Sequence, residues 1–338
     1  MTIENKTLAV VIPAYRAEGS IGGVIRSMPA CVDRIIVVDD ASPDGLARAV
    51  EEAGDKRTVL IRHQKNRGVG GAMVTGFRKA LELGADLVAK VDADGQMDPA
   101  QLPAFARAAL LHGCDYVKAN RFGHIDALPA MPRARLAGSI ALTFLTKFAS
   151  GYWNVFDPQN GYVLISRRML KRLDLSAIDP GYFFENSMLI NLNVMRARIA
   201  EIYLPARYGG EISSMKLHRI LLSFPWKLFK GFCYRVYHKY VFRSTSPFAL
   251  LLFFGLALML WGGIWGGRAW LLSFRTGIPA ATGTVVLGLL PLLLGFASIL
   301  QALVLDVADA GECLLFDADD ESLAPRDAGQ TLEKNQSG

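Results

Sequence analysis

The chain has 338 residues, of which 51% are hydrophobic, and a formal net charge of +6. That length allows one large core or two modest ones, and the mean hydropathy of +0.26 indicates that part of the chain lies outside water. The four cysteines have neither CxxC spacing nor a histidine at zinc-ligand spacing, which excludes a zinc site and indicates free thiols in a reducing compartment.

Apolar runs alternate with helical patterns along the first part of the chain. The run at 8–12 is too short for a signal peptide and predicts a strand, so we expect this half in the cytoplasm. Further strands are predicted at 34–38, 58–61 and 87–91, with helices at 18–28, 44–53 and 70–83. This alternation predicts an α/β fold with an open, mostly parallel sheet covered on both faces, in which ligands bind beyond the carboxyl ends of the strands.

Carboxylates follow two of these predicted strands. Asp92 and Asp94 are one residue apart, and their oxygen ligands suit Mg²⁺ or Mn²⁺, which would stabilise the negative charge of a departing nucleoside diphosphate. One carboxylate of the earlier pair, Asp39 and Asp40, would accept hydrogen bonds from a base or ribose hydroxyl. An isolated DxD triplet is more often a solvated turn, so the Asp92–Asp94 assignment depends on this second pair.

A glycine-rich turn, NRGVGG at 66–71, opens the third predicted helix. Such turns let the backbone approach a ligand closely, and helix N-termini favour anions. A plain helix start explains the same residues equally well.

A basic, aromatic-rich segment covers residues 216–243 and contains no acidic residue. It predicts an amphipathic helix, or a helix pair broken at Pro225, in the headgroup layer of a membrane. The alternative is a surface helix of a soluble domain. The membrane segment that follows favours lipid over nucleic acid as the partner.

Two segments without charged residues follow, and they predict spans at about 246–267 and 282–305. The short connection holds Arg268 and Arg275, and Pro291 is expected to kink the second helix. The basic cluster before the first span places that side in the cytoplasm. The predicted organisation is an α/β domain at 1–215, a juxtamembrane segment at 216–243, a hairpin at 244–305 and an acidic, partly disordered cytoplasmic tail at 306–338. One span plus a re-entrant segment is the alternative.

Several ordered motifs together resemble the family-2 glycosyltransferases with the GT-A fold. The resemblance covers about 7–218 and is nearest to the polyprenyl-phosphate branch, which includes dolichol-phosphate mannose synthases and bacterial polyprenyl-phosphate glucosyltransferases. The motifs are VVIPAYRAEGSI, IIVVDDASPDG, NRGVGGAMVTGFRKAL, VDADGQMDP, DPQNGYVLISR, GYFFEN and RYGGEISSMK.

The resemblance implies a role for residues at each motif. Asp94 would ligate the metal, with Asp92 at the ribose or diphosphate and Gln96 beside them. The nucleoside would be held by Pro13, Tyr15, Glu18 and Asp40. The transferred sugar or acceptor would meet Asp157, Gln159 and Asn160, and Glu185 would face the same cleft. Phosphate oxygens would meet Arg121, Arg207 and Lys216.

The predicted reaction is a single displacement that inverts the anomeric carbon, with no protein nucleophile. If the acceptor is a polyprenyl phosphate, undecaprenyl or dolichyl, its second pKa of about 6 removes the need for a strong base, and Asp157 then only orients groups. A hydroxyl acceptor on a growing glycan requires a carboxylate base, Asp157 or Glu185. A non-catalytic membrane scaffold is the third interpretation. The donor nucleotide, GDP or UDP, stays open, and the resemblance allows a homo-oligomer.

Overall fold

The computed structural model describes residues 5–121, 133–204, 217–242, 246–311, 313–317, 320 and 323. An eight-stranded sheet forms its centre, in the order β3-β2-β1-β4-β6-β5-β7-β8. Only β6 runs antiparallel to its neighbours, so the predicted mostly parallel sheet is confirmed. The strands are β1 (Leu8–Ala14), β2 (Arg34–Asp39), β3 (Thr58–Arg62), β4 (Leu87–Lys90), β5 (Tyr116–Asn120), β6 (Val163–Ser166), β7 (Ile199–Tyr203) and β8 (Leu314–Asp317).

Helices cover both faces of this sheet because successive strand residues point to opposite sides. On one face, Val10 and Ile12 of β1 belong to a core built with three helices, α1 (Glu18–Arg26), α2 (Leu46–Ala53) and α4 (Leu102–Leu111). On the other face, Val11 packs in a core with α3 (Gly68–Glu82), α6 (Arg167–Arg172) and α7 (Phe184–Val194). Gly76 of α3 is needed there, since a Cβ would lie 2.2 Å from the Val11 side chain.

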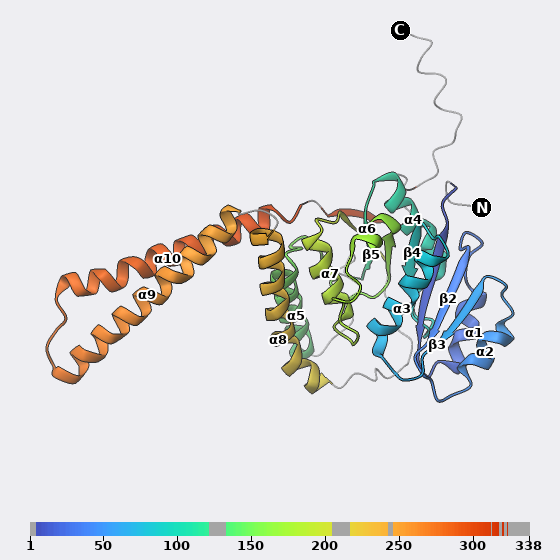
Figure 1. Ribbon diagram of the computed structural model, residues 1–338, viewed down its shortest axis with the longest axis horizontal. Coiled ribbons are helices and arrows are strands. Elements are labelled where there is room, and N and C mark those ends of the chain that lie inside the picture. Colours follow the sequence, from blue (N-terminus) through green and yellow to red (C-terminus); the bar gives the residue numbers. More distant parts are fainter. Residues whose placement is uncertain are drawn as a thin grey trace, which may run out of the picture.

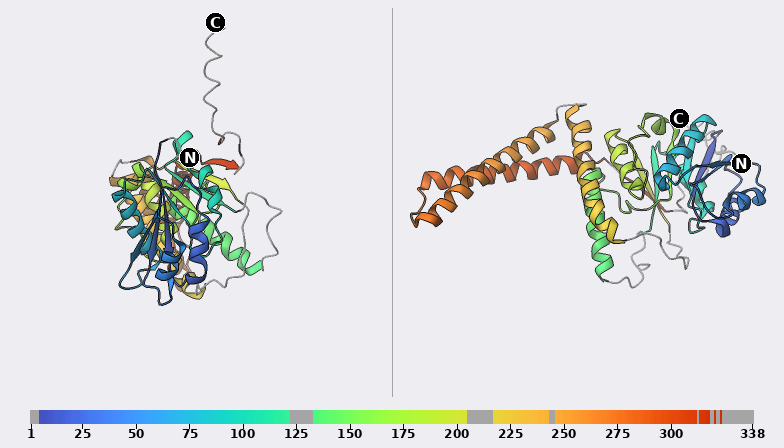
Figure 2. Two further views of the ribbon diagram at one scale, coloured as in Figure 1. Left: turned by 90° about the vertical axis from the view of Figure 1, so that its right-hand side faces the viewer. Right: turned by 60° about the horizontal axis from the view of Figure 1, so that its bottom comes forward.

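Two helices lie side by side between this α/β domain and the apolar hairpin (Figures 1 and 2). They are α5 (Arg133–Ser150) and α8 (Leu217–Arg235), and α8 continues as a π-helical turn, η3 (Val236–Phe242). A small core joins them to α7, with Phe224 and Leu228 packed on Ile190. Of the two predicted alternatives, the helix pair broken at Pro225 is wrong, because Pro225 lies inside the continuous helix α8.

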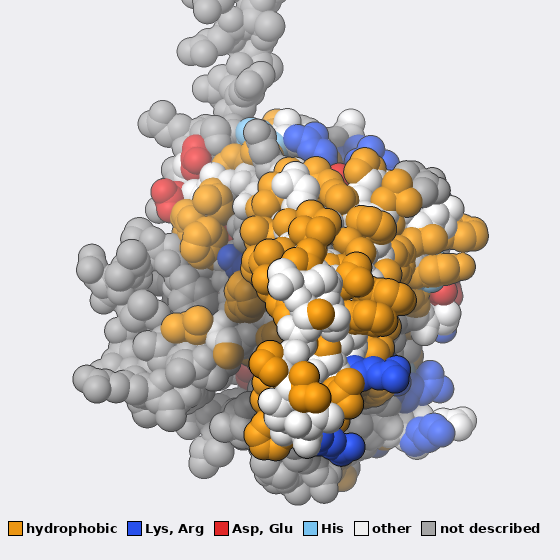
Figure 3. All heavy atoms as spheres, turned by 90° about the vertical axis from the view of Figure 1, so that its left-hand side faces the viewer, with side chains coloured by type: hydrophobic (Ala, Val, Ile, Leu, Met, Phe, Trp, Pro, Cys, Tyr) orange, Lys and Arg blue, Asp and Glu red, His pale blue; other side chains and the backbone are white. Residues whose placement is uncertain are grey.

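The hairpin consists of α9 (Pro247–Thr276) and α10 (Thr282–Ala308), which are long and apolar enough to cross a membrane. Only 22% and 11% of their most apolar windows are buried, so they are not core helices of a soluble domain. Figure 3 views the molecule from the side of the hairpin and shows hydrophobic side chains over much of that side. The two helices pack through glycines; a Cβ on Gly255 would lie 2.9 Å from the Gly295 carbonyl oxygen.

Both predicted spans extend further than the charge-free segments suggest. Arg268 and Arg275, predicted in the connection, belong to α9, where Arg275 lies in the last turn. Cations are favourable there because they face the negative end of the helix dipole, and long side chains reach polar surroundings.

The chain beyond the hairpin returns to the central sheet. Residues 314–317 form β8, which pairs in parallel with β7 from Ala200↔Leu314 to Tyr203↔Asp317. The predicted tail at 306–338 therefore contributes an edge strand to the domain that we expected to end at residue 215.

Candidate active site

The carboxyl ends of β2, β1 and β4 lie at one edge of the sheet. Asp39 is paired with Ala14, and Lys90 with Val11, in the parallel ladders that join these strands. The residues at or just after the ends of the three strands, 13–15, 39–42 and 92–94, therefore lie at the same edge. Sequence reasoning brought these segments together correctly.

A buried lysine connects the first carboxylate of the DxD triplet to Glu185. The Lys90 ammonium at the end of β4 lies 2.7 Å from Asp92 Oδ1 and 3.6 Å from Glu185 Oε1. Its side chain is only 2% exposed. Burial opposes its charged form, but the two carboxylates outweigh burial and raise the pKa of Lys90. Burial also raises the pKa of Glu185, against the effect of Lys90.

Gly161 leaves the space that this cluster needs. A Cβ at position 161 would lie 2.4 Å from the Lys90 ammonium and 3.3 Å from Glu185 Oε1. The cluster thus joins β4, the start of α7 and the segment before β6.

The second carboxylate of the triplet, Asp94, lies in a turn that follows β4. Its Oδ1 accepts the backbone N–H of Gln96 at 2.9 Å, while Gly95 adopts a left-handed φ of +76°. Asp94 is half-buried, whereas the Gln96 side chain is exposed. Asp92 and Asp94 thus both lie in the segment that directly follows the end of β4.

Asp40 organises the protein's own backbone. Its carboxylate accepts the N–H groups of Arg67 and Gly68, each at 2.8 Å, and pairs with His63 Nδ1 at 2.6 Å. Asp40 therefore binds the backbone N–H groups at the N-terminus of α3, where a ligand-binding turn was one of two predictions. The nearby glycines serve packing, because a Cβ on Gly70 would lie 2.0 Å from the Asp179 carbonyl oxygen.

Asp39, in contrast, has one carboxylate oxygen without a hydrogen bond among the described residues. Its Oδ1 accepts the Ser42 N–H at 2.7 Å, whereas Oδ2 is buried with no hydrogen-bond partner among the described residues. The Arg62 Nε lies 3.2 Å from Oδ2, as an ion pair without hydrogen-bond geometry. Buried polar atoms are rarely left unsatisfied, so this oxygen is suited to accept a bond from a ligand.

Asp157 is held by Arg121 through two parallel contacts. Arg121 Nε donates to Oδ2 at 2.8 Å and Nη2 to Oδ1 at 3.0 Å, and Asn160 Nδ2 also donates to Oδ2, at 3.2 Å. Burial of Asp157 would raise its pKa, but Arg121 and the nearby Lys118 outweigh burial and hold the pKa below its usual value. A carboxylate in this state is a poor proton acceptor.

Two charged residues inside apolar strands form hydrogen bonds with the backbone of the loop that carries Asp157. The Lys118 ammonium on β5 donates to the carbonyl oxygens of Asp157 and Asn160. Glu201 on β7 accepts the N–H groups of Phe156 and Asp157, both within 3.1 Å. The β6 ladder pairs Val163 with both Lys90 and Lys118, so residues 157–161 lie between two buried lysines.

Gln159 belongs to a hydrogen-bonded side-chain network with Thr146 and Asn186. Its Nε2 donates to Thr146 Oγ1 and Asn186 Oδ1, both at 3.1 Å. Asn160 is buried and its Oδ1 accepts the Tyr162 N–H at 3.0 Å. These contacts join α5 and α7 to the segment that carries Asp157.

The remaining predicted residues lie around the β1 end of the edge. Glu18 Oε2 accepts the Gly45 N–H at 3.0 Å, so Glu18 holds the start of α2. Pro13 is partly exposed and Tyr15 is 46% exposed, with the Arg16 guanidinium over its ring. Arg207 and Lys216 lie outside the described residues.

The sequence that forms this edge is similar to known proteins. A family model described as Glycosyl transferase family 2 matches residues 9–174. The undecaprenyl-phosphate mannosyltransferase of Micrococcus luteus is 32% identical, over 57% of this chain and 80% of its own length. The chain belongs to glycosyltransferase family 2. The UDP-N-acetylglucosamine–dolichyl-phosphate N-acetylglucosaminyltransferase of Methanococcus voltae is 29% identical over 65% of this glycosyltransferase and 93% of its own length.

The fold of this glycosyltransferase is shared by solved structures. Glucosyl-3-phosphoglycerate synthase from Mycobacterium tuberculosis, in complex with Mn²⁺, UDP-glucose and phosphoglyceric acid, superimposes with a TM-score of 0.52. It is 23% identical and covers 69% of this chain and 80% of its own. The predicted GT-A fold and the resemblance to the polyprenyl-phosphate branch are confirmed.

Three residues of the glycosyltransferase were missed by sequence reasoning as site residues: Lys90, Lys118 and Glu201. Asp39 had been named with Asp40 as one of two possible acceptors. A signal was present for the three missed residues, since a charge inside an apolar strand must find a buried partner. The partners are far away in the sequence, so the pattern alone did not identify them.

Proposed function

We propose that this glycosyltransferase moves a sugar from a nucleoside-diphosphate sugar to a polyprenyl phosphate, with inversion, at the cytoplasmic membrane face. The observation that carries the proposal is the Asp92–Asp94 pair at the end of β4, in a GT-A sheet whose chain continues into an exposed apolar hairpin. The relatives named above add support, because their names include dolichyl-phosphate and undecaprenyl-phosphate.

A divalent cation, Mg²⁺ or Mn²⁺, fits this site as a shared ligand. Among the described residues, no group of three or more His, Cys, Asp or Glu side chains is placed to hold a metal by itself. Mg²⁺ is commonly bound by one or two carboxylates together with substrate phosphates and water, which matches Asp92 and Asp94. Once bound, the ion would stabilise the charge that develops on the departing diphosphate. Lys90 occupies Oδ1 of Asp92 and so leaves Oδ2 for ligand contact.

The nucleoside would lie over the β1–β2 edge, and the contacts favour Asp39 over Asp40 as the hydrogen-bond acceptor. The Asp40 oxygens are engaged with His63, Arg67 and Gly68, whereas Asp39 Oδ2 is buried and lacks such a bond. Tyr15 is exposed beside this edge, together with Pro13, and offers a face to a base or ribose. Glu18 and Asp40 would act by holding the surrounding backbone.

The state of Asp157 favours an acceptor that is already ionised. Arg121 pairs with both Asp157 oxygens, and the pKa of Asp157 is lowered. Asp157 is therefore suited to orienting groups and not to removing a proton. A phosphate monoester, with a second pKa of about 6, needs no strong base at neutral pH. Glu185, whose pKa is raised, is the remaining carboxylate for a hydroxyl acceptor. Gln96, Gln159, Asn160, Arg207 and Lys216 would complete the sugar and phosphate contacts.

The membrane placement follows from charge and apolarity. The hairpin would cross the cytoplasmic membrane, with the basic α8–η3 segment and the catalytic domain on the cytoplasmic side. Exposed aromatic side chains on the helices beside the hairpin, Phe144, Trp226, Phe229 and Tyr237, suit the interfacial layer.

A donor screen tests this function directly. Purified full-length protein would be mixed with a panel of UDP- and GDP-sugars, a short polyprenyl phosphate and Mn²⁺, and products would be detected by mass spectrometry. We expect one sugar to be added to the phosphate, and EDTA to abolish the product. Transfer only to hydroxyl acceptors would replace the proposed acceptor. The absence of nucleoside diphosphate release with every donor, under conditions where a family relative is active, would indicate a scaffold.

A further inference from the structure

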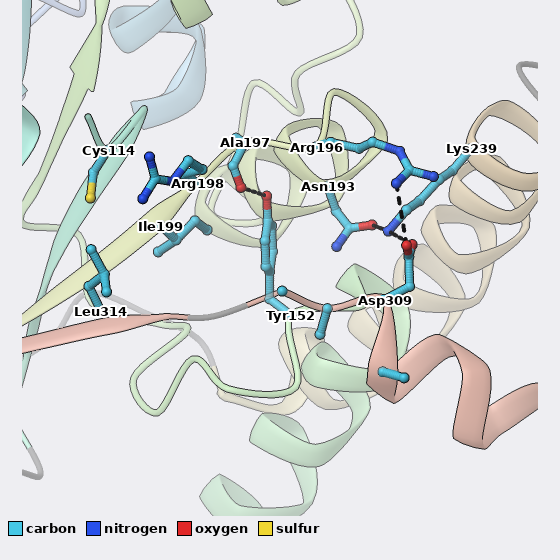
Figure 4. Close-up of a pocket in the computed structure, with 13 residues that line it drawn as sticks. Cys114, Tyr152, Asn193, Arg196, Ala197, Arg198, Ile199, Lys239, Asp309 and Leu314 are labelled. Carbon is cyan, nitrogen blue, oxygen red and sulfur yellow. Dashed lines mark hydrogen bonds and ion pairs between the residues drawn. The ribbon is translucent and has the colours of Figure 1, made fainter. Parts of the chain in front are cut away.

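A second polar pocket lies away from the DxD edge, where the chain leaves and enters the hairpin. Its volume is about 460 Å³, and it lies between the turn after α7, the start of β7, η3 and the segment after α10 (Figure 4). Three cations line it, Arg196, Arg198 and Lys239, against one lining carboxylate, Asp309. No residue of this pocket belongs to the site described above.

Arg196 occupies a backbone position that is unfavourable for it. It follows the C-cap of α7 with a left-handed φ of 55°, and the Ala197 N–H bonds to the Leu192 carbonyl oxygen at 3.0 Å. Glycine is the usual residue at this position because it has no Cβ to strain. An arginine here accepts that strain and directs a guanidinium to the pocket, where its Nη1 lies 3.3 Å from Asp309 Oδ1. Backbone strain of this kind gathers at functional sites.

Lys239 also carries a cost. Its side chain is 3% exposed, and burial lowers the pKa of its ammonium despite the pairing with Asp309 at 2.7 Å. Its Nζ also donates to Asn193 Oδ1 at 2.7 Å. Lys239 lies in the π-helical turn η3, and such turns are frequent at functional sites.

Arg198 is the third cation that lines this pocket. In Figure 4 it lies on the other side of Tyr152 from Arg196, Lys239 and Asp309. Its guanidinium makes no ion pair within the part of the chain that the structure describes. The neighbouring Asp115 is paired with Arg168 at 2.6 Å. From Arg198 it accepts the backbone N–H and not the guanidinium.

We propose that this pocket binds the anionic headgroup of a membrane phospholipid. The shared chemistry is a phosphate group, which arginine and lysine bind well. The location selects the lipid over free phosphate. Lys239 lies eight residues before the start of α9, and the lining residues 309–311 directly follow α10, so the pocket lies at the depth of the headgroups if the hairpin spans the membrane. The inference rests on the membrane placement of the proposed function, but not on the sugar transfer itself.

Native mass spectrometry of the purified full-length protein tests this site. The protein would be held in a neutral detergent with equal amounts of phosphatidylglycerol and phosphatidylcholine, and the bound lipids would be counted. We expect preferential retention of phosphatidylglycerol. The double variant Arg196→Gly, Arg198→Ala should lower that retention roughly tenfold or more, since each cation near a headgroup contributes separately.

Matched variants separate binding from folding. Arg196→Gly removes the strained backbone position, so its melting temperature should equal or exceed that of the wild type. Arg78→Ala removes an exposed cation from α3 and should leave lipid retention unchanged. Equal retention of both lipids, unchanged retention in the double variant, or saturable binding of inorganic phosphate without a preference for phosphatidylglycerol would each overturn the proposal. Sugar transfer is not the readout, so these results are independent of the transferase assay.

Discussion

Arg235 of α8 and Asp306 of α10 form a buried, two-point ion pair that joins the catalytic domain to the apolar hairpin. Nη1 lies 2.6 Å from Oδ1 and Nη2 lies 3.0 Å from Oδ2, and the two side chains are 0% and 2% exposed. Tyr240 and Trp153 also donate to Asp306, and Arg235 Nε donates to the Ala149 carbonyl oxygen. The partners of this pair come from α5, the segment after α5 and η3, so the pair fixes how these segments meet the hairpin.

Asp306→Asn should loosen this junction. Removing one charge of a buried pair leaves the other uncompensated, and we expect a loss of about 3–5 kcal/mol in the free energy of unfolding. Thermal unfolding of the full-length protein in detergent would measure it, and limited proteolysis would report cleavage near η3. Glu52→Gln breaks the exposed Arg48–Glu52 pair and should cost less than about 1 kcal/mol. Equal stability of the two variants would contradict this role of Asp306.

Asp94→Asn tests the second carboxylate of the DxD triplet. Because Asp94 is proposed to contact the metal and the leaving diphosphate, we expect the transfer rate to fall by about 10²-fold or more. The melting temperature should change little, since Asp94 is only half-buried. Direct Mn²⁺ binding, followed by electron paramagnetic resonance, should weaken in parallel. Asp174→Asn, at an exposed turn, supplies the control. Full activity in Asp94→Asn would remove the metal role.

Gly161→Ala tests the space around Lys90. The added Cβ would lie 2.4 Å from the Lys90 ammonium, which must then move away from Asp92 or Glu185. We expect a stability loss of about 1–3 kcal/mol and a clear fall in kcat. Gly23→Ala in α1 meets nothing within 4 Å and should stabilise slightly, by about 0.5–1 kcal/mol. A Gly161→Ala enzyme with the activity and stability of Gly23→Ala would show that the Lys90 cluster tolerates displacement.

The Arg121–Asp157 pair predicts a pH-dependent stability. The folded pKa of Asp157 lies below its unfolded value of about 3.9, so the folded state binds fewer protons and the stabilisation is complete above that value. It is lost as the pH falls through the folded pKa. Arg121→Ala should therefore cost about 1–3 kcal/mol at pH 7, and the gap to the wild type should close in acid. Denaturant unfolding at several pH values would measure the gap; a gap that stays constant with pH would contradict the assignment.

Local patterns account for much of the fold. The strands β1 to β4 and the two apolar helices were predictable because strand and helix periodicity, and the absence of charge over a long segment, are properties of neighbouring residues. The DxD edge was also predictable, since carboxyl ends of parallel strands meet at one edge.

The partners inside the site required the three-dimensional register. Lys90 and Lys118 both lie opposite Val163, and no pattern in β4 or β5 announces that β6 enters between them in the opposite direction. The different states of Asp39 and Asp40 depend on the loop at His63–Gly68, which bonds to the carboxylate of Asp40 and not to that of Asp39. Strand β8 has only four residues and follows the hairpin, so its apolar run was too short to distinguish it from the tail.

The pairing of β8 with β7 constrains how the polypeptide can be threaded through a bilayer. Because the segments before α9 and after α10 both end in one hydrogen-bonded domain, a hairpin that enters a membrane would begin and finish on the same side. Only an even number of crossings satisfies that parity, which disfavours a single crossing combined with a re-entrant loop. The edge strand is also made last by the ribosome, so the sheet can be completed only after the hairpin has been synthesised.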